Sequence, residues 1–135
     1  MNSENEFGIK PKKYKTSPLS NEKTEQYLRK IEKAMREEKL FLIKNLTLKT
    51  FSGLVGIQSR HVSQVINHDL GLSFSEYVLK YRLEEVKKNL LNPDNNNLTI
   101  HGIAQNSGFT SNSRFNYLFK KETGLTPTQF RNQKG

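Results

Sequence analysis

Two stretches of this chain repeat one another: residues 46–77 read LTLKTFSGLVGIQSRHVSQVINHDLGLSFSEY, and residues 98–130 read LTIHGIAQNSGFTSNSRFNYLFKKETGLTPTQF. At an offset of 52 residues, Gly56 matches Gly108. At an offset of 53, which reflects one extra turn residue in the second copy, Val62 matches Phe115. Matched apolar and glycine positions in an internal repeat predict two copies of one supersecondary unit.

Each copy has the pattern of a helix-turn-helix. The first helix of this motif needs a small residue where the second helix crosses it, and the turn needs a glycine. The small residues are Ser52 and Ala104, and the turn glycines are Gly56 and Gly108. The second helices need buried apolar residues, predicted as Val62, Val65 and Ile66 in the first copy and Phe115, Leu118 and Phe119 in the second. We therefore predict an all-α fold of two helix-turn-helix subdomains, built as homeodomain-like three-helix units and joined by a connecting helix.

Local signals place the helix boundaries. Thr47 and Thr99 are predicted N-caps, and Ser73 and Thr126 each begin a capping box with Glu or Gln three residues later. The predicted elements in chain order are a basic flexible linker at 1–20, an amphipathic lead-in helix at 21–41 that is docked or dimerising, and a two-unit domain at 42–132. Within that domain they are a first helix-turn-helix at 47–70, a connecting helix at 74–91, a second helix-turn-helix at 99–123 and a C-terminal helix at 127–132.

Composition limits the classes of function. The formal net charge is +9 and the isoelectric point is about 9.8, which favours a polyanionic partner, either nucleic acid or an anionic membrane. The chain has no cysteine, so disulfides and thiolate metal sites are excluded and a reducing compartment is expected. His61, His68 and His101 have no metal-ligand spacing, and no catalytic motif is present. We predict that the protein is not an enzyme and has no metal site or cofactor.

The outward faces of the two second helices carry polar side chains that suit DNA bases. If the apolar residues face inward, a rotation of ~100° per residue turns the polar positions outward. Arg can bind guanine, and Asn or Gln can bind adenine, while an ordinary solvated face is the alternative interpretation. The candidate base-reading residues are Arg60, Ser63, Gln64 and Asn67 in the first copy and Asn112, Ser113, Arg114, Asn116 and Tyr117 in the second.

Other residues are candidates for contacts with the DNA backbone. Helix N-termini and Lys or Arg side chains commonly bind phosphate, although each of these charges could equally serve solubility. The candidates are Thr47, Lys49, Arg82, Thr99, Lys120 and Lys121. A connecting helix of 18 residues spans ~27 Å, comparable with the ~34 Å between successive major-groove windows on one face of a duplex. The chain is therefore predicted to bind two adjacent windows.

The chain from about Leu46 to Asn132 resembles the C-terminal DNA-binding domain of AraC/XylS-type transcription regulators. The resemblance is clearest in IAQNSGFTSNSRFNYLFKKETGLTPTQFR, residues 103–131, and HVSQVIN with GLSFSEYVLKYRL, within residues 61–83, looks like the first unit. It implies seven helices, sequence-specific binding to promoter DNA, and activation through contact with RNA polymerase. Carried over by position, it implies the same base-reading residues as the outward faces.

The first unit departs from the family pattern. Ser52 occupies a position where the family usually has alanine. Gly53 lies inside the predicted helix, where glycine costs about 1 kcal/mol relative to alanine. Tyr117 stands in the second unit where many members have a smaller or basic residue. We therefore predict that the first unit is less stable than the second, and we do not predict an operator sequence.

The segment before the domain resembles the linker and lead-in helix of longer regulators that carry an N-terminal sensor. The expected partners are thus double-stranded promoter DNA, RNA polymerase, a sensor domain outside this chain and a second copy of the chain. The expected location is the cytoplasm, or the inner membrane surface if a missing N-terminal region tethers the domain. A free-standing short activator is the alternative organisation. The alternative function is an architectural or protein-interaction helical module with non-specific DNA affinity, whose helix at 21–41 pairs with a partner or with itself.

Overall fold

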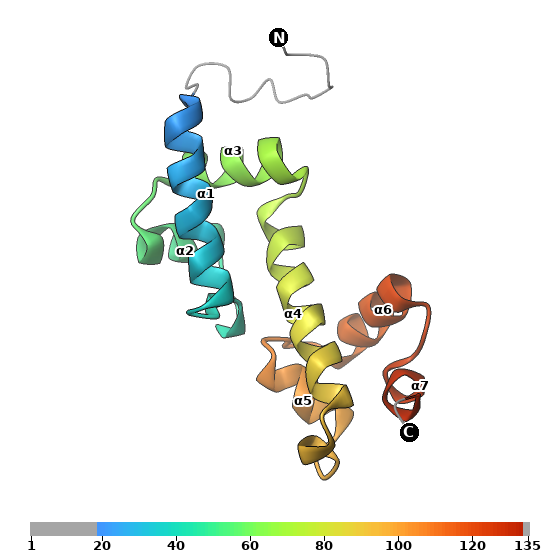
Figure 1. Cartoon of the computed structure of the whole chain (residues 1–135). Coiled ribbons are helices and arrows are strands. Elements are labelled where there is room, and N and C mark those ends of the chain that lie inside the picture. Colours follow the sequence, from blue (N-terminus) through green and yellow to red (C-terminus); the bar gives the residue numbers. More distant parts are fainter. Residues whose placement is uncertain (1–18, 134–135) are drawn as a thin grey trace. The chain divides into compact units, whose positions relative to one another are not determined.

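The computed structural model describes residues 19–133 and contains seven α-helices and no strand in that range. The α-helices are α1 (Asn21–Arg36), α2 (Leu48–Val55), α3 (Ser59–Leu70), α4 (Phe74–Leu91), α5 (Ile100–Asn106), α6 (Asn112–Thr123) and α7 (Pro127–Asn132) (Figure 1). Two short 3-10 turns are η2 (Leu40–Leu42) and η3 (Pro93–Asn95). The prediction of an all-α fold is confirmed. The predicted linker at 1–20 lies outside the described residues except for its last two positions.

The described chain forms two compact units. The first consists of residues 19–39 and 47–77, and the second consists of residues 40–46 and 78–133. The first therefore contains α1, α2 and α3, and the second contains α5, α6 and α7. The helix α4 begins in the first unit and continues into the second.

In the first unit, α1 packs against α2 and α3 (Figure 1). Ile31 and Met35 of α1 are completely buried, and so is Phe51 of α2. The predicted core residues of α3 are buried as well, namely Val62, Val65 and Ile66. The buried residues of the lead-in helix are thus covered by the protein's own first unit.

The predicted lead-in helix at 21–41 is too long, because α1 ends at Arg36. Lys39 adopts a left-handed backbone conformation with φ 51°, which a continuing α-helix does not allow. Leu40–Leu42 then form a separate 3-10 turn that belongs to the second unit. Leu40 and Phe41, at the end of the predicted helix, thus belong to a different element, and periodicity alone cannot detect such a change of direction.

Ser52, the predicted small residue of the first helix-turn-helix, is buried in the first unit. Its side chain is 5% exposed, and its Oγ has no hydrogen-bond partner in the described part of the chain. A buried hydroxyl that makes no hydrogen bond has lost its contact with water without compensation. We therefore expect Ser52 to lower the stability of this unit.

Replacing Ser52 with alanine is expected to raise the free energy of unfolding by about 1 kcal/mol, because it removes the uncompensated hydroxyl. Ser107 provides the matched control, since it is fully buried but its Oγ donates a hydrogen bond to the Ile103 carbonyl at 2.8 Å. Ser107→Ala should lower the free energy of unfolding by about 1 kcal/mol. Urea titrations followed by circular dichroism measure both, and equal losses for the two variants would contradict the account of Ser52.

In the second unit, apolar residues of α4, α5, α6 and the turn between α5 and α6 form one core. Its buried members are Leu83, Val86, Leu90, Ile103, Ala104, Phe109, Phe115 and Phe119. The ring of Phe119 also meets that of Phe130 in an edge contact, with 5.4 Å between centroids. Leu118, predicted to be buried with Phe115 and Phe119, is only partly buried. It lies at the edge of the inward face of α6, so the helix buries its two phenylalanines more deeply.

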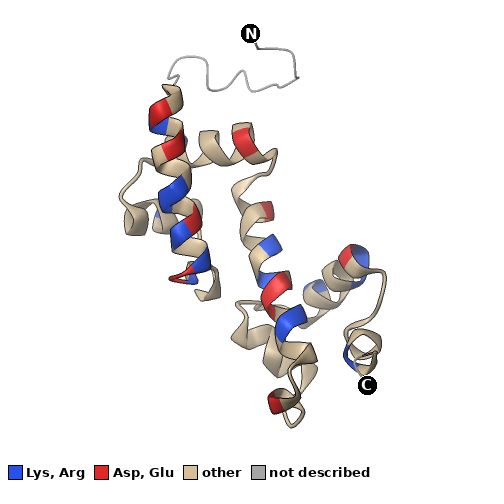
Figure 2. Cartoon of the chain, in the orientation of Figure 1, with Lys and Arg blue, Asp and Glu red and all other residues tan. Residues whose placement is uncertain are grey.

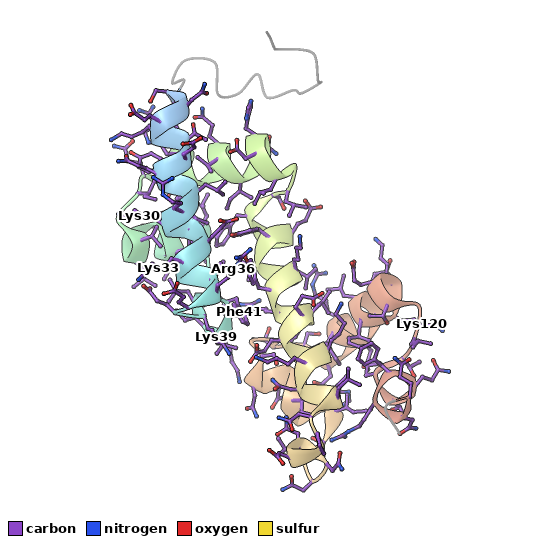
Figure 3. All side chains as sticks on the ribbon, viewed as in Figure 1. Lys30, Lys33, Arg36, Lys39, Phe41 and Lys120 are labelled. Atoms are coloured by element: carbon purple, nitrogen blue, oxygen red, sulfur yellow. The ribbon has the colours of Figure 1, made fainter. Side chains whose placement is uncertain are left out.

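The segment at 40–46 is fastened to the second unit by Arg82 of α4. Arg82 Nε donates to the Phe41 carbonyl and Arg82 Nη2 donates to the Ile43 carbonyl, both at 2.8 Å. The rings of Phe41 and Tyr81 stack with centroids 5.7 Å apart (Phe41 is labelled in Figure 3). Gly108 lies against the same junction with φ 104°. These contacts order a segment that has only one 3-10 turn of its own.

Candidate nucleic-acid interface

The first helix-turn-helix consists of α2, a turn at Gly56 and α3. Gly56 ends α2 in the left-handed conformation with φ 73°, where glycine is favoured because it has no Cβ. The buried face of α3 then fixes which side chains point away from the core. Arg60 is exposed, and three other candidates are half-buried, namely Ser63, Gln64 and Asn67.

Gln64 differs from the other candidates in one respect. Its Oε1 is buried and has no hydrogen-bond partner among the described residues. A bidentate contact to adenine uses both the oxygen and the nitrogen of the amide. Gln64 must therefore change its rotamer before it can bind a base in this way, whereas Arg60 is already accessible.

The second helix-turn-helix consists of α5, a turn at Gly108 and α6. All five candidates on α6 are exposed, namely Asn112, Ser113, Arg114, Asn116 and Tyr117. Tyr117 is 64% exposed, which is unusual for a large aromatic side chain. Ser111 caps the helix by accepting a hydrogen bond from the Arg114 backbone nitrogen at 3.2 Å. The polar face of α6 is thus open to a ligand.

The structure adds a neighbour that the sequence reasoning missed. His101 Nε2 of α5 lies 3.5 Å from Asn116 Nδ2 of α6. His101 is the repeat equivalent of Lys49, which is a phosphate candidate. The repeat offset of 52 residues would have identified it.

The phosphate candidates fall into two groups. The hydroxyls of Thr47 and Thr99 already cap their helices, since Thr47 Oγ1 accepts from the Thr50 nitrogen at 3.1 Å and Thr99 Oγ1 from the Gly102 nitrogen at 2.9 Å. The lysines are exposed, namely Lys49, Lys120 and Lys121 (Lys120 is labelled in Figure 3). Lys121 Nζ lies 5.9 Å from the ring centroid of Tyr117, within the range of a cation–π contact.

Arg82 differs from the other phosphate candidates because it already makes hydrogen bonds within the second unit. Its guanidinium is partly buried and donates to the Phe41 and Ile43 carbonyls in the second unit. Burial lowers the pKa of Arg82 from its ordinary value. The sequence could not reveal this role, because the carbonyls lie about 40 residues away and carry no side-chain signature.

The basic residues are not collected in one block. Figure 2 shows Lys and Arg on α1, α4, α6 and α7, with Asp or Glu beside them on α1, α4 and α6. Because acidic neighbours reduce the local field, individual positions matter more than the net charge.

In the described range, no helix is both long enough and apolar enough to cross a membrane. No group of three or more His, Cys, Asp or Glu residues in that range could hold a metal ion.

Comparisons with known proteins identify the family. Residues 52–133 match the family described as a helix-turn-helix domain. The chain is 32% identical over 93 residues to the transcriptional regulatory protein YesN of Bacillus subtilis, covering 67% of this chain and 25% of YesN. It is 33% identical over 86 residues to the probable transcription factor PqrA of Proteus vulgaris, covering 64% of this chain and 68% of PqrA. The chain thus spans about a quarter of the length of YesN.

Solved structures agree with the family match. The C-terminal domain of AraT, a response regulator from Geobacillus stearothermophilus, is 29% identical with a TM-score of 0.64, covering 87% of this chain and 88% of that one. An AraC-type regulator from Chromobacterium violaceum is 22% identical with a TM-score of 0.69, covering 85% and 97%, and this likeness shows the fold alone. The chain belongs to the helix-turn-helix domain family, and it is similar to transcriptional regulators and to the C-terminal domain of a response regulator.

Proposed function

We propose that this domain binds duplex DNA in a sequence-specific manner, with α3 and α6 each entering the major groove. The observation that carries the proposal is shared by both copies of the repeat. Each second helix buries its apolar residues in its own unit and presents polar side chains on the opposite face. A single helix of this kind could be an ordinary surface helix, but two in matching positions of a basic chain favour DNA recognition.

The proposed roles follow from the chemistry and exposure of each side chain. Arg60 and Arg114 suit guanine, since a guanidinium can donate to O6 and N7 together. Asn67, Asn112 and Asn116 suit adenine, which presents one donor and one acceptor in the major groove. The remaining base-reading candidates are Ser63, Gln64, Ser113 and Tyr117. Lys49, Lys120 and Lys121 are proposed to contact phosphates, together with the helix N-termini at Thr47 and Thr99.

We also propose that the two units bind adjacent windows of the major groove and that the domain is the output module of a longer activator. The 18 residues of α4 span ~27 Å, against ~34 Å between successive windows. The likeness to the C-terminal domain of the response regulator AraT supports the role as an output module. Transcription in vitro from a promoter carrying the selected DNA site would test activation through RNA polymerase, and a reduced transcript level would make the domain a repressor.

Replacing Arg60 with alanine is expected to reduce sequence preference. Duplexes selected from a random pool by the wild-type chain, and scrambled duplexes of equal composition, provide the two ligands for fluorescence anisotropy. Arg60→Ala should reduce the affinity ratio of selected to scrambled DNA about tenfold, since one bidentate base contact contributes about 1–3 kcal/mol. Gln64→Ala should reduce the ratio in the same direction.

Lys121→Ala is the matched comparison, because a phosphate contact carries no sequence information. It should weaken binding to both duplexes equally and reduce the steepness of the salt dependence by about one unit. If the wild-type chain bound both duplexes equally, sequence-specific recognition would be ruled out. If Lys121→Ala alone changed the preference, the assignment of roles to these side chains would be wrong.

A further inference from the structure

In the first unit, α1 meets the first turn of α3 through stacked rings. The rings of Tyr27 and His61 lie 5.7 Å apart between centroids, with 25° between their planes. Lys23 Nζ lies 5.6 Å from the centroid of the Tyr27 ring. Lys23 and Tyr27 are four residues apart on α1 and therefore share one face of that helix. The lead-in helix thus places a lysine beside the helix that is proposed to bind bases.

Two positive charges, those of Lys23 and Arg60, lie close enough to His61 to affect its pKa. Burial lowers the pKa of His61, and the charges of Arg60 and Lys23 lower it further. Within residues 19–133, neither Lys23 nor Arg60 takes part in an ion pair. A lowered pKa favours the neutral imidazole, which still has one ring N–H to donate to an anion, and the charges of Lys23 and Arg60 attract such an anion. The arrangement is therefore better suited to a complex with an anion than to the free protein.

The identity of the anion follows from where the cluster lies. His61 directly follows Arg60 on α3, and Arg60 is the exposed base-reading candidate of the first unit. A helix whose first turn reaches base edges has the sugar-phosphate backbone beside it. The anion nearest to His61 in such a complex is a DNA phosphate.

We propose that Lys23 and His61 hold one phosphate of the DNA backbone next to the base pairs bound by α3, and that Tyr27 positions His61 for this contact. This inference rests on the proposed function. It makes α1 part of the DNA-binding surface as well as part of the core of the first unit. The helix outside the helix-turn-helix then contributes affinity but no sequence preference.

The first test is the salt dependence of DNA binding by Lys23→Gln, which removes the charge and keeps a side chain of similar length. We expect the slope of log affinity against log salt to become shallower by about 0.9 and the affinity at about 0.1 M salt to fall about eightfold. Selected and scrambled duplexes should lose affinity equally. The backbone nitrogen of Lys23, which donates to Ser20 Oγ at 3.1 Å, is unchanged by the substitution, so the helix cap is kept.

Arg29→Gln is the matched control. Arg29 is exposed on α1 and lies about 240° around the helix from Lys23. Its replacement by glutamine therefore removes one positive charge from a different side of the same helix. We expect Arg29→Gln to keep the wild-type slope and affinity within about twofold, since charges more distant than the contact are screened by salt. Equal losses for the two variants would show that only the overall charge of α1 matters, and the proposed contact would be wrong.

The second test locates the phosphate. Selected duplexes carrying one neutral methylphosphonate linkage are compared across the backbone positions of the site. At one linkage, the neutral group should lower the affinity of the wild-type chain for the duplex about eightfold. It should leave the affinity of Lys23→Gln unchanged, because the charge that would contact this phosphate is already absent. Tyr27→Ala should also lose its sensitivity at that linkage, and Tyr27→Phe, which keeps the stacked ring, should retain it.

The outcomes separate this inference from the proposed function. If the wild-type chain does not distinguish selected from scrambled duplexes, sequence-specific recognition fails first. A second outcome is that the wild-type chain distinguishes the duplexes while every methylphosphonate linkage lowers the affinity of the wild-type chain and of Lys23→Gln by the same factor. In that case the phosphate contact from α1 is wrong and the proposed function stands. If Lys23→Gln changes the sequence preference instead, Lys23 binds a base and the proposed role is overturned.

Discussion

Replacing Gly108 with alanine is expected to lower the free energy of unfolding of the second unit by about 3 kcal/mol. Two effects add at this residue. Its backbone has φ 104°, which side-chain-bearing residues rarely adopt. A Cβ at this position would also lie 2.6 Å from both the Phe41 carbonyl oxygen and Arg82 Nε. Neither atom can yield easily, because the two are hydrogen-bonded to one another.

Gly124→Ala separates the two effects. Gly124 also has a positive φ, 81°, but nothing lies within 4 Å of the position of its Cβ. Gly124→Ala should lower the free energy of unfolding by only about 1 kcal/mol, which is the cost of placing alanine at a positive φ. Thermal and urea unfolding followed by circular dichroism measure both variants. Equal losses for Gly108→Ala and Gly124→Ala would show that the close approach to Phe41 and Arg82 has no energetic consequence.

Arg82→Ala is expected to lower the free energy of unfolding of the second unit by about 3 kcal/mol. The substitution removes two hydrogen bonds from a charged donor and leaves two carbonyls without that donor. The segment at 40–46 should then loosen, which hydrogen exchange at its amides would detect. Arg82→Lys should restore only part of the stability, since an ammonium lacks the planar fork that serves both carbonyls.

Lys80→Ala is the control for Arg82→Ala. Lys80 is exposed on the same helix, and its replacement should change the free energy of unfolding by less than about 0.5 kcal/mol. Arg82→Ala, measured where it is still folded, should keep the wild-type salt dependence of DNA binding. A variant with normal stability and a slope reduced by about one unit would restore Arg82 to the phosphate contacts.

The difference between Arg82 and Lys121 shows where sequence reasoning reached its limit. Both residues are basic and lie on predicted helices, so pattern and charge treat them alike. Lys121 is exposed, whereas Arg82 meets carbonyls from a segment about 40 residues earlier in the chain. Backbone carbonyls belong to every residue type, and no pattern of side chains marks which ones will need a donor.

The sequence by itself determined the repeated helical architecture, the inward faces of α3 and α6, and the family. These features depend on local signals that recur in both copies: turn glycines, cap residues and apolar residues at helical spacing. Only the tertiary structure decided the end of α1 at Arg36, the attachment of residues 40–46 to the second unit, and the meeting of Tyr27 with His61. The last two depend on contacts between segments that are distant in the chain, and the energies of such contacts leave no periodic signature in the sequence.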